Sequence, residues 1–225
     1  MTNSTENPAY QERLTRFEKA VSLDHPDRLP ITPIGMQFFD SLQAGITNRQ
    51  AMKDHRERYQ IWRDFVIEYQ FDMAPALGTF PAQILETLAA KHYLWPGGDL
   101  ADHLPFQYVE KEYLLQDEYD QLLANPGDFT CRVIWPRKSG LLETAKSLPP
   151  LHWLGLDPAV LGSYLGNPEV VNSLKGLIQL GEEYQEWLEI HISTVQELEG
   201  KGFPLSYGTP YGHTAFDVIA DYYRG

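Results

Sequence analysis

Cysteine is almost absent from this sequence of 225 residues, in which Cys131 is the single example. One cysteine excludes a disulfide framework, and it excludes a zinc site that draws two or more cysteines from this chain. Apolar runs are also short, and none approaches the about 20 residues that cross a bilayer. Residues 1–7 have neither the basic nor the apolar part of a signal peptide. We therefore expect a reduced, cytoplasmic protein.

Basic residues are scarce, with 18 Lys and Arg against 31 Asp and Glu, which gives a formal net charge of −13. Such a charge makes nucleic acid and anionic membranes poor partners, because both are themselves negative. The rest of the composition, 43% hydrophobic and 22% charged, is typical of a globular protein. We find no linker that divides the chain, so we expect a single domain over 1–225.

Common catalytic motifs are missing as well. The sequence contains no Gly-rich dinucleotide loop, no phosphate-binding loop and no Gly-x-Ser-x-Gly. Its seven histidines show no His-x-x-x-His or His-Glu-x-x-His spacing. We therefore expect no metal site, and we see no cofactor site, in this chain.

Helical patterns dominate what is present. Asn7 and Pro8 suit the start of a helix that ends before the His25-Pro26 pair. Apolar residues at helical spacing predict a long helix over about 55–69, and a longer one from Pro168 to Gly200 that Gly176 or Gly181 could divide. Thr47 is placed to cap a short helix, and 117–123 suit another.

Three short apolar runs between these helices read as strands, at 29–35, 71–78 and 203–208. A helical pattern begins again at 214–223. Alternation of helix and strand predicts parallel α/β architecture. A closed barrel of this kind needs eight strands. We therefore expect a partial (β/α)8 barrel, its N-terminal half or slightly more, with an irregular, hairpin-like insertion in the middle.

Asp72 is the strongest single candidate for a catalytic role. It lies in a strand candidate between Phe71 and Met73, where burial would disfavour its charge unless it has a partner. Polar residues at strand ends of α/β barrels point into the active site. The alternative is that Asp72 caps a turn or pairs with a nearby base. His213, in the loop 211–214 before a helix, is a candidate substrate-binding residue, with packing or capping as its alternative.

Four segments, in order along the chain, resemble the uroporphyrinogen decarboxylase family, whose superfamily includes cobalamin-dependent methyltransferases. They are LDHPDRLP at 23–30, FDMAPALG at 71–78, the acidic stretch 109–129 and AFDVIADYYRG at 215–225. The resemblance implies a (β/α)8 barrel with its site at the C-terminal face. It carries Asp72 over as the aspartate that binds the pyrrole NH groups of a tetrapyrrole.

One departure shapes the functional expectation. Decarboxylases have arginines after the first strand, whereas this sequence has Met36 and Gln37 in that stretch, which we expect to contact the substrate. The resemblance therefore favours a methyltransferase-type member acting with a corrinoid protein. Its zinc is held in the family by a His-x-Cys pair and a later Cys, ligands that we expect beyond Gly225. Tetrapyrrole decarboxylation in porphyrin biosynthesis is the alternative.

A third alternative belongs to another class, an inactive or partner-completed half-barrel, so whether the chain is an enzyme stays open. The expected partners are a small-molecule substrate or a corrinoid protein, and the chain could form a homo-oligomer. The residues do not distinguish among methyl donors and acceptors.

Overall fold

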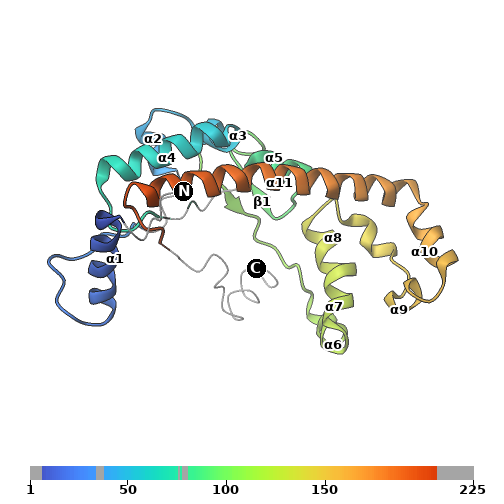
Figure 1. Ribbon diagram of the computed structural model, residues 1–225. Helices are drawn as coiled ribbons and strands as arrows, with labels where there is room; N and C mark the ends of the chain where they lie inside the picture. The colour runs from blue at the N-terminus through green and yellow to red at the C-terminus, as the bar shows by residue number, and fades with distance from the viewer. Residues whose placement is uncertain (1–6, 34–37, 76, 78–80, 207–225) are drawn as a thin grey trace. The chain divides into compact units, whose positions relative to one another are not determined.

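The computed structural model describes residues 7–33, 38–75, 77 and 81–206 (Figure 1). Its α-helices are α1 (Pro8–Val21), α2 (Phe39–Gln43), α3 (Asn48–Lys53), α4 (His55–Tyr69), α5 (Ala82–Thr87), α6 (Tyr119–Ala124), α7 (Pro126–Phe129), α8 (Trp135–Lys138), α9 (Leu151–Leu154), α10 (Pro158–Leu165) and α11 (Pro168–Gly200). Shorter helical turns are η2 (Gln116–Glu118), η3 (Thr130–Ile134) and η4 (Glu143–Ser147), and the two strands are β1 (Tyr93–Leu94) and β2 (Gln107–Tyr108).

The expected parallel α/β fold is wrong. The described residues are 61% helical, and their one sheet pairs β1 with β2 in antiparallel register, Tyr93 opposite Tyr108. The partial (β/α)8 barrel predicted over 1–225, a TIM barrel, is therefore overturned. Of the two strands, β2 lies within the stretch 106–115 where a hairpin or an extended excursion is expected, and β1 lies before that stretch.

The segments expected as strands fail to build a ladder because prolines interrupt their donors. In their described parts they meet through one parallel bridge, Ala74 with Leu205. The Asp72 N–H also donates to the Ile31 carbonyl at 3.0 Å. A proline has no N–H to donate, so it ends such pairing. The prolines in these segments are Pro30, Pro33, Pro75 and Pro204.

The long helices follow their predicted bounds, because apolar periodicity and caps agree. Asn7 caps α1 by accepting from the Ala9 N–H, and α4 runs from His55 to Tyr69 as expected. Thr47 caps α3 in a capping box with Gln50. α11, the orange helix of Figure 1, continues through both internal glycines.

A proline also shapes the helical stretch α7–η3–α8. Pro136 has no N–H to give to the carbonyl of Arg132, four residues earlier. The preceding turn, η3, accordingly widens into a π-helix. Phe129 and Ile134 from this stretch pack with Leu114 in a buried cluster.

The chain divides into two compact units. Within the described residues, unit 1 takes those of 1–81, 100–105 and 185–206, and unit 2 takes 82–99 and 106–184. α11 contributes residues to both. The core of unit 1 is an apolar cluster of Tyr59, Trp62, Phe65, Val66, Phe71, Ala74, Leu198 and Phe203. This cluster lies next to the residue that the sequence singles out, Asp72.

Candidate functional site: the Asp72 ion-pair network

Backbone contacts help to fix the position of Asp72. α4 ends at Tyr69, and the capping residue Gln70 takes a left-handed conformation with φ 54°, so the chain turns there into the unit 1 core. The Asp72 side chain is 0% exposed. The Ile31 N–H donates to its Oδ2 at 2.7 Å. This bond fixes the carboxylate against the segment that follows α1.

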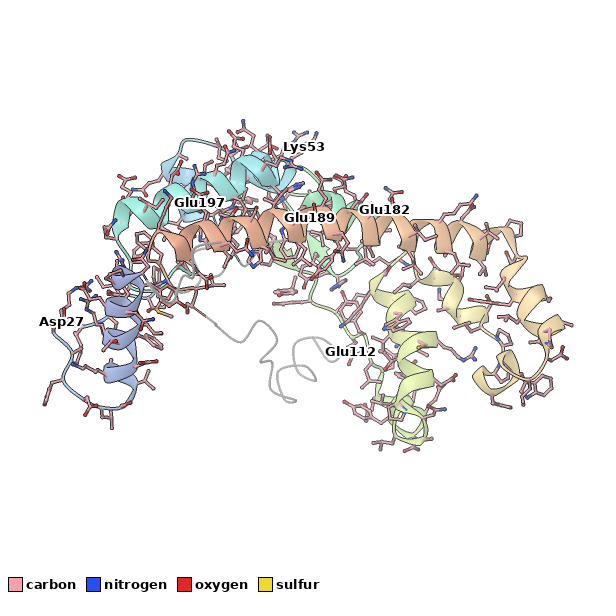
Figure 2. The ribbon with its side chains drawn as sticks, in the orientation of Figure 1. Asp27, Lys53, Glu112, Glu182, Glu189 and Glu197 are labelled. Carbon is pink, nitrogen blue, oxygen red and sulfur yellow. The ribbon has the colours of Figure 1, made fainter. Side chains whose placement is uncertain are left out.

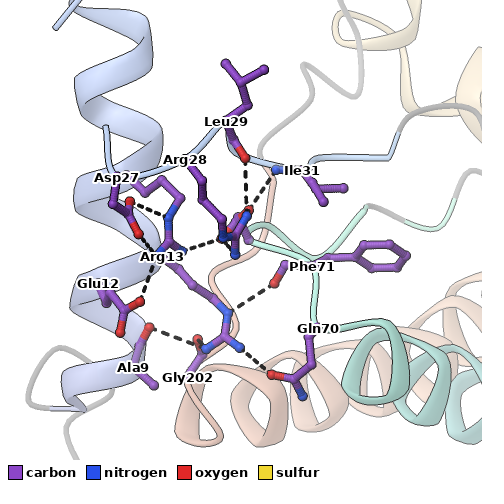
Figure 3. A network of polar contacts seen from close by, with 12 residues as sticks. Ala9, Glu12, Arg13, Asp27, Arg28, Leu29, Ile31, Gln70, Phe71 and Gly202 are labelled. Atoms are coloured by element: carbon purple, nitrogen blue, oxygen red, sulfur yellow. Dashed lines mark hydrogen bonds and ion pairs between the residues drawn. The ribbon is translucent and has the colours of Figure 1, made fainter. Parts of the chain in front are cut away.

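Arg28 binds the same carboxylate in a bidentate manner, through both Nη atoms of its guanidinium (Figure 3). Its Nη1 donates to Oδ2 at 2.6 Å, and its Nη2 donates to Oδ1 at 2.8 Å. Two parallel bonds of this kind are strong and directional, because both partners are charged and planar. Arg28 is 46% exposed, so one end of the network contacts solvent.

Arg16 is the buried end of the network. It projects from α1 with 4% of its side chain exposed, and its Nη1 donates to Asp72 Oδ1 at 2.6 Å. Its Nε and Nη2 each donate to Asp27 at 2.7 Å, and Nη2 also reaches Glu12 at 2.7 Å. Arg16 thus links α1, the loop after it and the segment after α4.

These contacts keep the carboxylates ionised. Burial alone would raise the pKa of Asp72, but the bonds from Arg28, Ile31 and Arg16 outweigh it and hold that pKa below its ordinary value. The Arg16 hydrogen bonds lower the pKa of Asp27 to about 2. In this network, the negative charges of the ionised carboxylates offset the positive charges of the arginines.

Arg13, one turn before Arg16 on α1, ties the same region to the end of α11 (Figure 3). It donates to the carbonyls of Phe71 at 3.1 Å and Gly202 at 2.9 Å, and to Gln70 Oε1 at 2.8 Å. Its guanidinium also lies 4.2 Å from the centre of the Phe203 ring. Arg13 and Arg16 therefore hold α1 against the rest of unit 1.

Four donor contacts reach the two oxygens of Asp72, and this arrangement suits an anchor. A general base or a ligand-binding carboxylate needs an oxygen directed at its substrate. The geometry places Asp72 in the ion pairs that the sequence analysis gave as the alternative. Its catalytic role stays a prediction.

The other predicted site residues do not join this network. Met36, Gln37 and His213 lie outside the described residues. Sequence reasoning missed Arg16, Arg28 and Asp27, although the last two stand in the LDHPDRLP segment. The sequence signal was the need of a buried aspartate for cations, which does not say which of the seven preceding arginines supply them.

A second cluster of cations lies at the start of α4. Arg49, Lys53 and Arg56 line an open cleft of about 520 Å³. Arg49 pairs with Asp102 and Arg56 pairs with Glu186, so these two cations are already compensated. Two of the three cations at this cleft are therefore not available to bind an anionic ligand without losing an ion pair.

No group of three His, Cys, Asp or Glu side chains in the described ranges could hold a metal ion. The described residues thus provide no fit for zinc, and we derive no step through it. Within the same ranges, no helix has both the length and the apolar character needed to cross a membrane.

No family model, curated protein or solved structure matches this chain.

Proposed function

We propose that this chain functions by binding a protein partner through an apolar surface of unit 2. The observation that carries the proposal is the exposure of large apolar side chains on consecutive elements. Leu156 is 81% exposed, Ile178 64% and Trp153 53%. Leu161 and Leu165, one turn apart on α10, are also exposed. We name the exposed apolar residues of α9, α10, the turn between them and the first half of α11 the apolar surface. Among them are Trp153, Leu156, Leu161, Leu165, Leu174 and Ile178.

Removing this surface from water is favourable by about 25 cal/mol per Å². Contiguous exposed apolar patches on soluble proteins mark interaction sites. α9 and α10 pack together, so their exposed side chains can act as one contact surface, and α10 is followed directly along the chain by α11. A chain completed by a partner is one of the alternatives given under Sequence analysis, although the half-barrel named there is not the fold observed.

The test is a photo-crosslinking amino acid placed at Leu161, in the middle of α10, in cells that make the full chain. The matched control carries it at Lys19, an exposed position on α1. We expect one adduct of defined mass from position 161 and none from position 19. Absence of an adduct from 161, 156 and 178 alike would refute the proposal.

The activity implied by the family resemblance is a second candidate, and one observation favours it. The LDHPDRLP and FDMAPALG segments are joined directly, because Arg28 of the first binds Asp72 of the second. A methyltransferase-type reaction with a corrinoid protein predicts dependence on zinc. Tetrapyrrole decarboxylation predicts that Asp72→Asn abolishes turnover while circular dichroism stays unchanged. If Asp72→Asn instead loses its folded structure, the role of Asp72 is structural, as the anchor of the ion-pair network, and the decarboxylase candidate loses its support.

A further inference from the structure

α2 is amphipathic in the reverse of the usual sense. Its polar residues Asp40 and Ser41 are buried, whereas Phe39 is 54% exposed and Leu42 is 58% exposed. At 3.6 residues per turn, Phe39 and Leu42 lie on one side of the helix, and Asp40 and Ser41 lie on the other. A helix at the surface of a soluble protein ordinarily turns its apolar side inward.

A buried ion pair holds α2 in this orientation. The Asp40 carboxylate accepts from Arg58 of α4, and each of these side chains is 3% exposed. It also accepts from the Ser41 N–H at 3.0 Å. A buried ion pair stabilises a fold no more than well-packed apolar side chains of similar volume do. The exposure of Phe39 and Leu42 therefore brings the fold itself no gain.

A cleft of about 260 Å³ lies between α2 and α4. Ile61 and Phe65 give it apolar walls, whereas Asp64 and Glu68 give it acidic ones. The Phe39 ring contacts the Phe65 ring edge to face, with 6.0 Å between their centroids. The exposed apolar side of α2 therefore continues into the cleft, and all of these residues belong to unit 1.

The side of α4 that borders the cleft is negatively charged. Four residues spaced four, three and four positions apart lie on this side of the helix, and they are Glu57, Ile61, Asp64 and Glu68. Asp64 pairs with Arg63, which also reaches Glu197 of α11 (Figure 2). Glu57 and Glu68 are exposed, and neither forms an ion pair with another described side chain. Their charges are therefore available to a partner.

We name the exposed apolar side of α2, the cleft and the acidic side of α4 the α2–α4 face. We propose that this face binds a basic amphipathic segment of another protein, in which lysines or arginines flank apolar side chains. The apolar side chains contact Phe39 and Leu42, and a basic side chain meets Glu68 at the edge of the cleft. Opposite charges around an apolar centre steer and orient such a partner. The α2–α4 face shares no residue with the apolar surface of unit 2, so this binding is independent of the proposed function.

The probe is a synthetic helical peptide with leucines along one side and lysines flanking them. Fluorescence anisotropy of the labelled peptide measures its dissociation constant with the full chain. We expect Leu42→Ser to raise this constant by about tenfold, because the leucine contact lies within the apolar centre of the face. Leu123→Ser on α6, where the side chain is 75% exposed, is the matched control and should leave the constant unchanged. Circular dichroism verifies that both variants are folded.

Charge reversal tests the acidic side of the face. Glu68→Lys should raise the dissociation constant roughly threefold to tenfold. Asp120→Lys, at an exposed position of α6, changes the net charge of the chain by the same amount and should have a much smaller effect. A peptide with glutamates in place of its lysines should instead bind Glu68→Lys more tightly than it binds the unmodified chain.

Three results would overturn the proposal. The first is a peptide that does not bind. The second is an equal effect of Glu68→Lys and Asp120→Lys, or of Leu42→Ser and Leu123→Ser, because the peptide would then respond to net charge or to apolar surface in general. The third comes from sedimentation equilibrium of the full chain: a dimer that Leu42→Ser dissociates would make a second copy of this chain the occupant of the face.

Discussion

At the scale of single residues, Arg16 is a buried cation in contact with three carboxylates, Glu12, Asp27 and Asp72. A guanidinium cannot lose its proton at any ordinary pH. Its burial is therefore tolerable only while negative partners surround it. The consequence is that Asp72 and Arg16 depend on each other.

We expect Asp72→Asn to lower the free energy of unfolding by about 3–5 kcal/mol, because the change leaves a buried charge without its inner partner. Asp102→Asn removes the exposed pair with Arg49, and such pairs contribute about 0–1 kcal/mol. Urea denaturation followed by tryptophan fluorescence measures both variants. A loss in Asp72→Asn no larger than in Asp102→Asn would show that the network does not anchor α1.

The same network predicts how stability depends on acid. The pKa of Asp27 is about 2 in the folded protein and about 3.9 in an unfolded chain. A depressed folded pKa contributes stability above the unfolded value, and this contribution is lost as pH falls from about 4 toward 2. Asp27→Asn should therefore flatten the fall in unfolding free energy over that range. Because Asp27 is exposed, high salt should shrink the difference; an unchanged slope would argue against the Arg16 pair.

Asp72 itself could be found from the sequence, since a carboxylate in an apolar run is costly without a partner. Its partners could not, because Arg16 and Arg28 precede it by 56 and 44 positions. No local periodicity relates residues so far apart. The charge requirement was therefore predictable, and the geometry that meets it was not.

At the scale of elements, the two internal glycines of α11 differ in their surroundings. Gly181 has open space where a Cβ would lie, whereas Gly176 faces Leu141. We expect Gly181→Ala to stabilise the protein by about 0.5–1 kcal/mol, the cost of a glycine within a helix. In Gly176→Ala the end of the Leu141 side chain must move aside, so we expect a smaller gain than in Gly181→Ala. Thermal unfolding of both variants checks this, and equal stabilisation would contradict the close contact at Gly176.

The elements that the sequence predicts well are the long helices, because α4 and α11 repeat apolar residues over many turns. The predicted strands at 29–35, 71–78 and 203–208 fail for a local reason. In the described part of each run, prolines withdraw N–H groups that a ladder needs. The one bridge between Ala74 and Leu205 forms because the Ala74 N–H donates to the Pro204 carbonyl and the Ser206 N–H donates to the Ala74 carbonyl.

At the scale of the whole molecule, the chain has two units with separate apolar clusters. Phe129 is 1% exposed in the cluster of unit 2, and replacing such a side chain by alanine costs about 3–5 kcal/mol. We expect Phe129→Ala to speed amide hydrogen exchange in α7 and α8 far more than in α4. Exchange followed by mass spectrometry of peptides from each helix measures this. Equal acceleration in α4 would show that both units unfold together.

The barrel prediction failed at this scale because alternation is ambiguous. Buried extended segments between helices produce the same apolar rhythm as parallel strands. Phe71 is an example, since it is buried in the unit 1 core without belonging to a strand. The sequence specifies what is buried more clearly than it specifies which backbones pair.

The fastening of α1 has a consequence for the nascent chain. Asn7 donates to the Gly200 carbonyl, 193 positions later, and Arg13 donates to that of Gly202, 189 positions later. On the ribosome, α1 must therefore wait until nearly all the described residues have been translated before it can dock. Contacts so distant along the chain slow folding, because a long loop must close first. Until then the arginines of α1 remain solvated, which keeps this early segment soluble during synthesis.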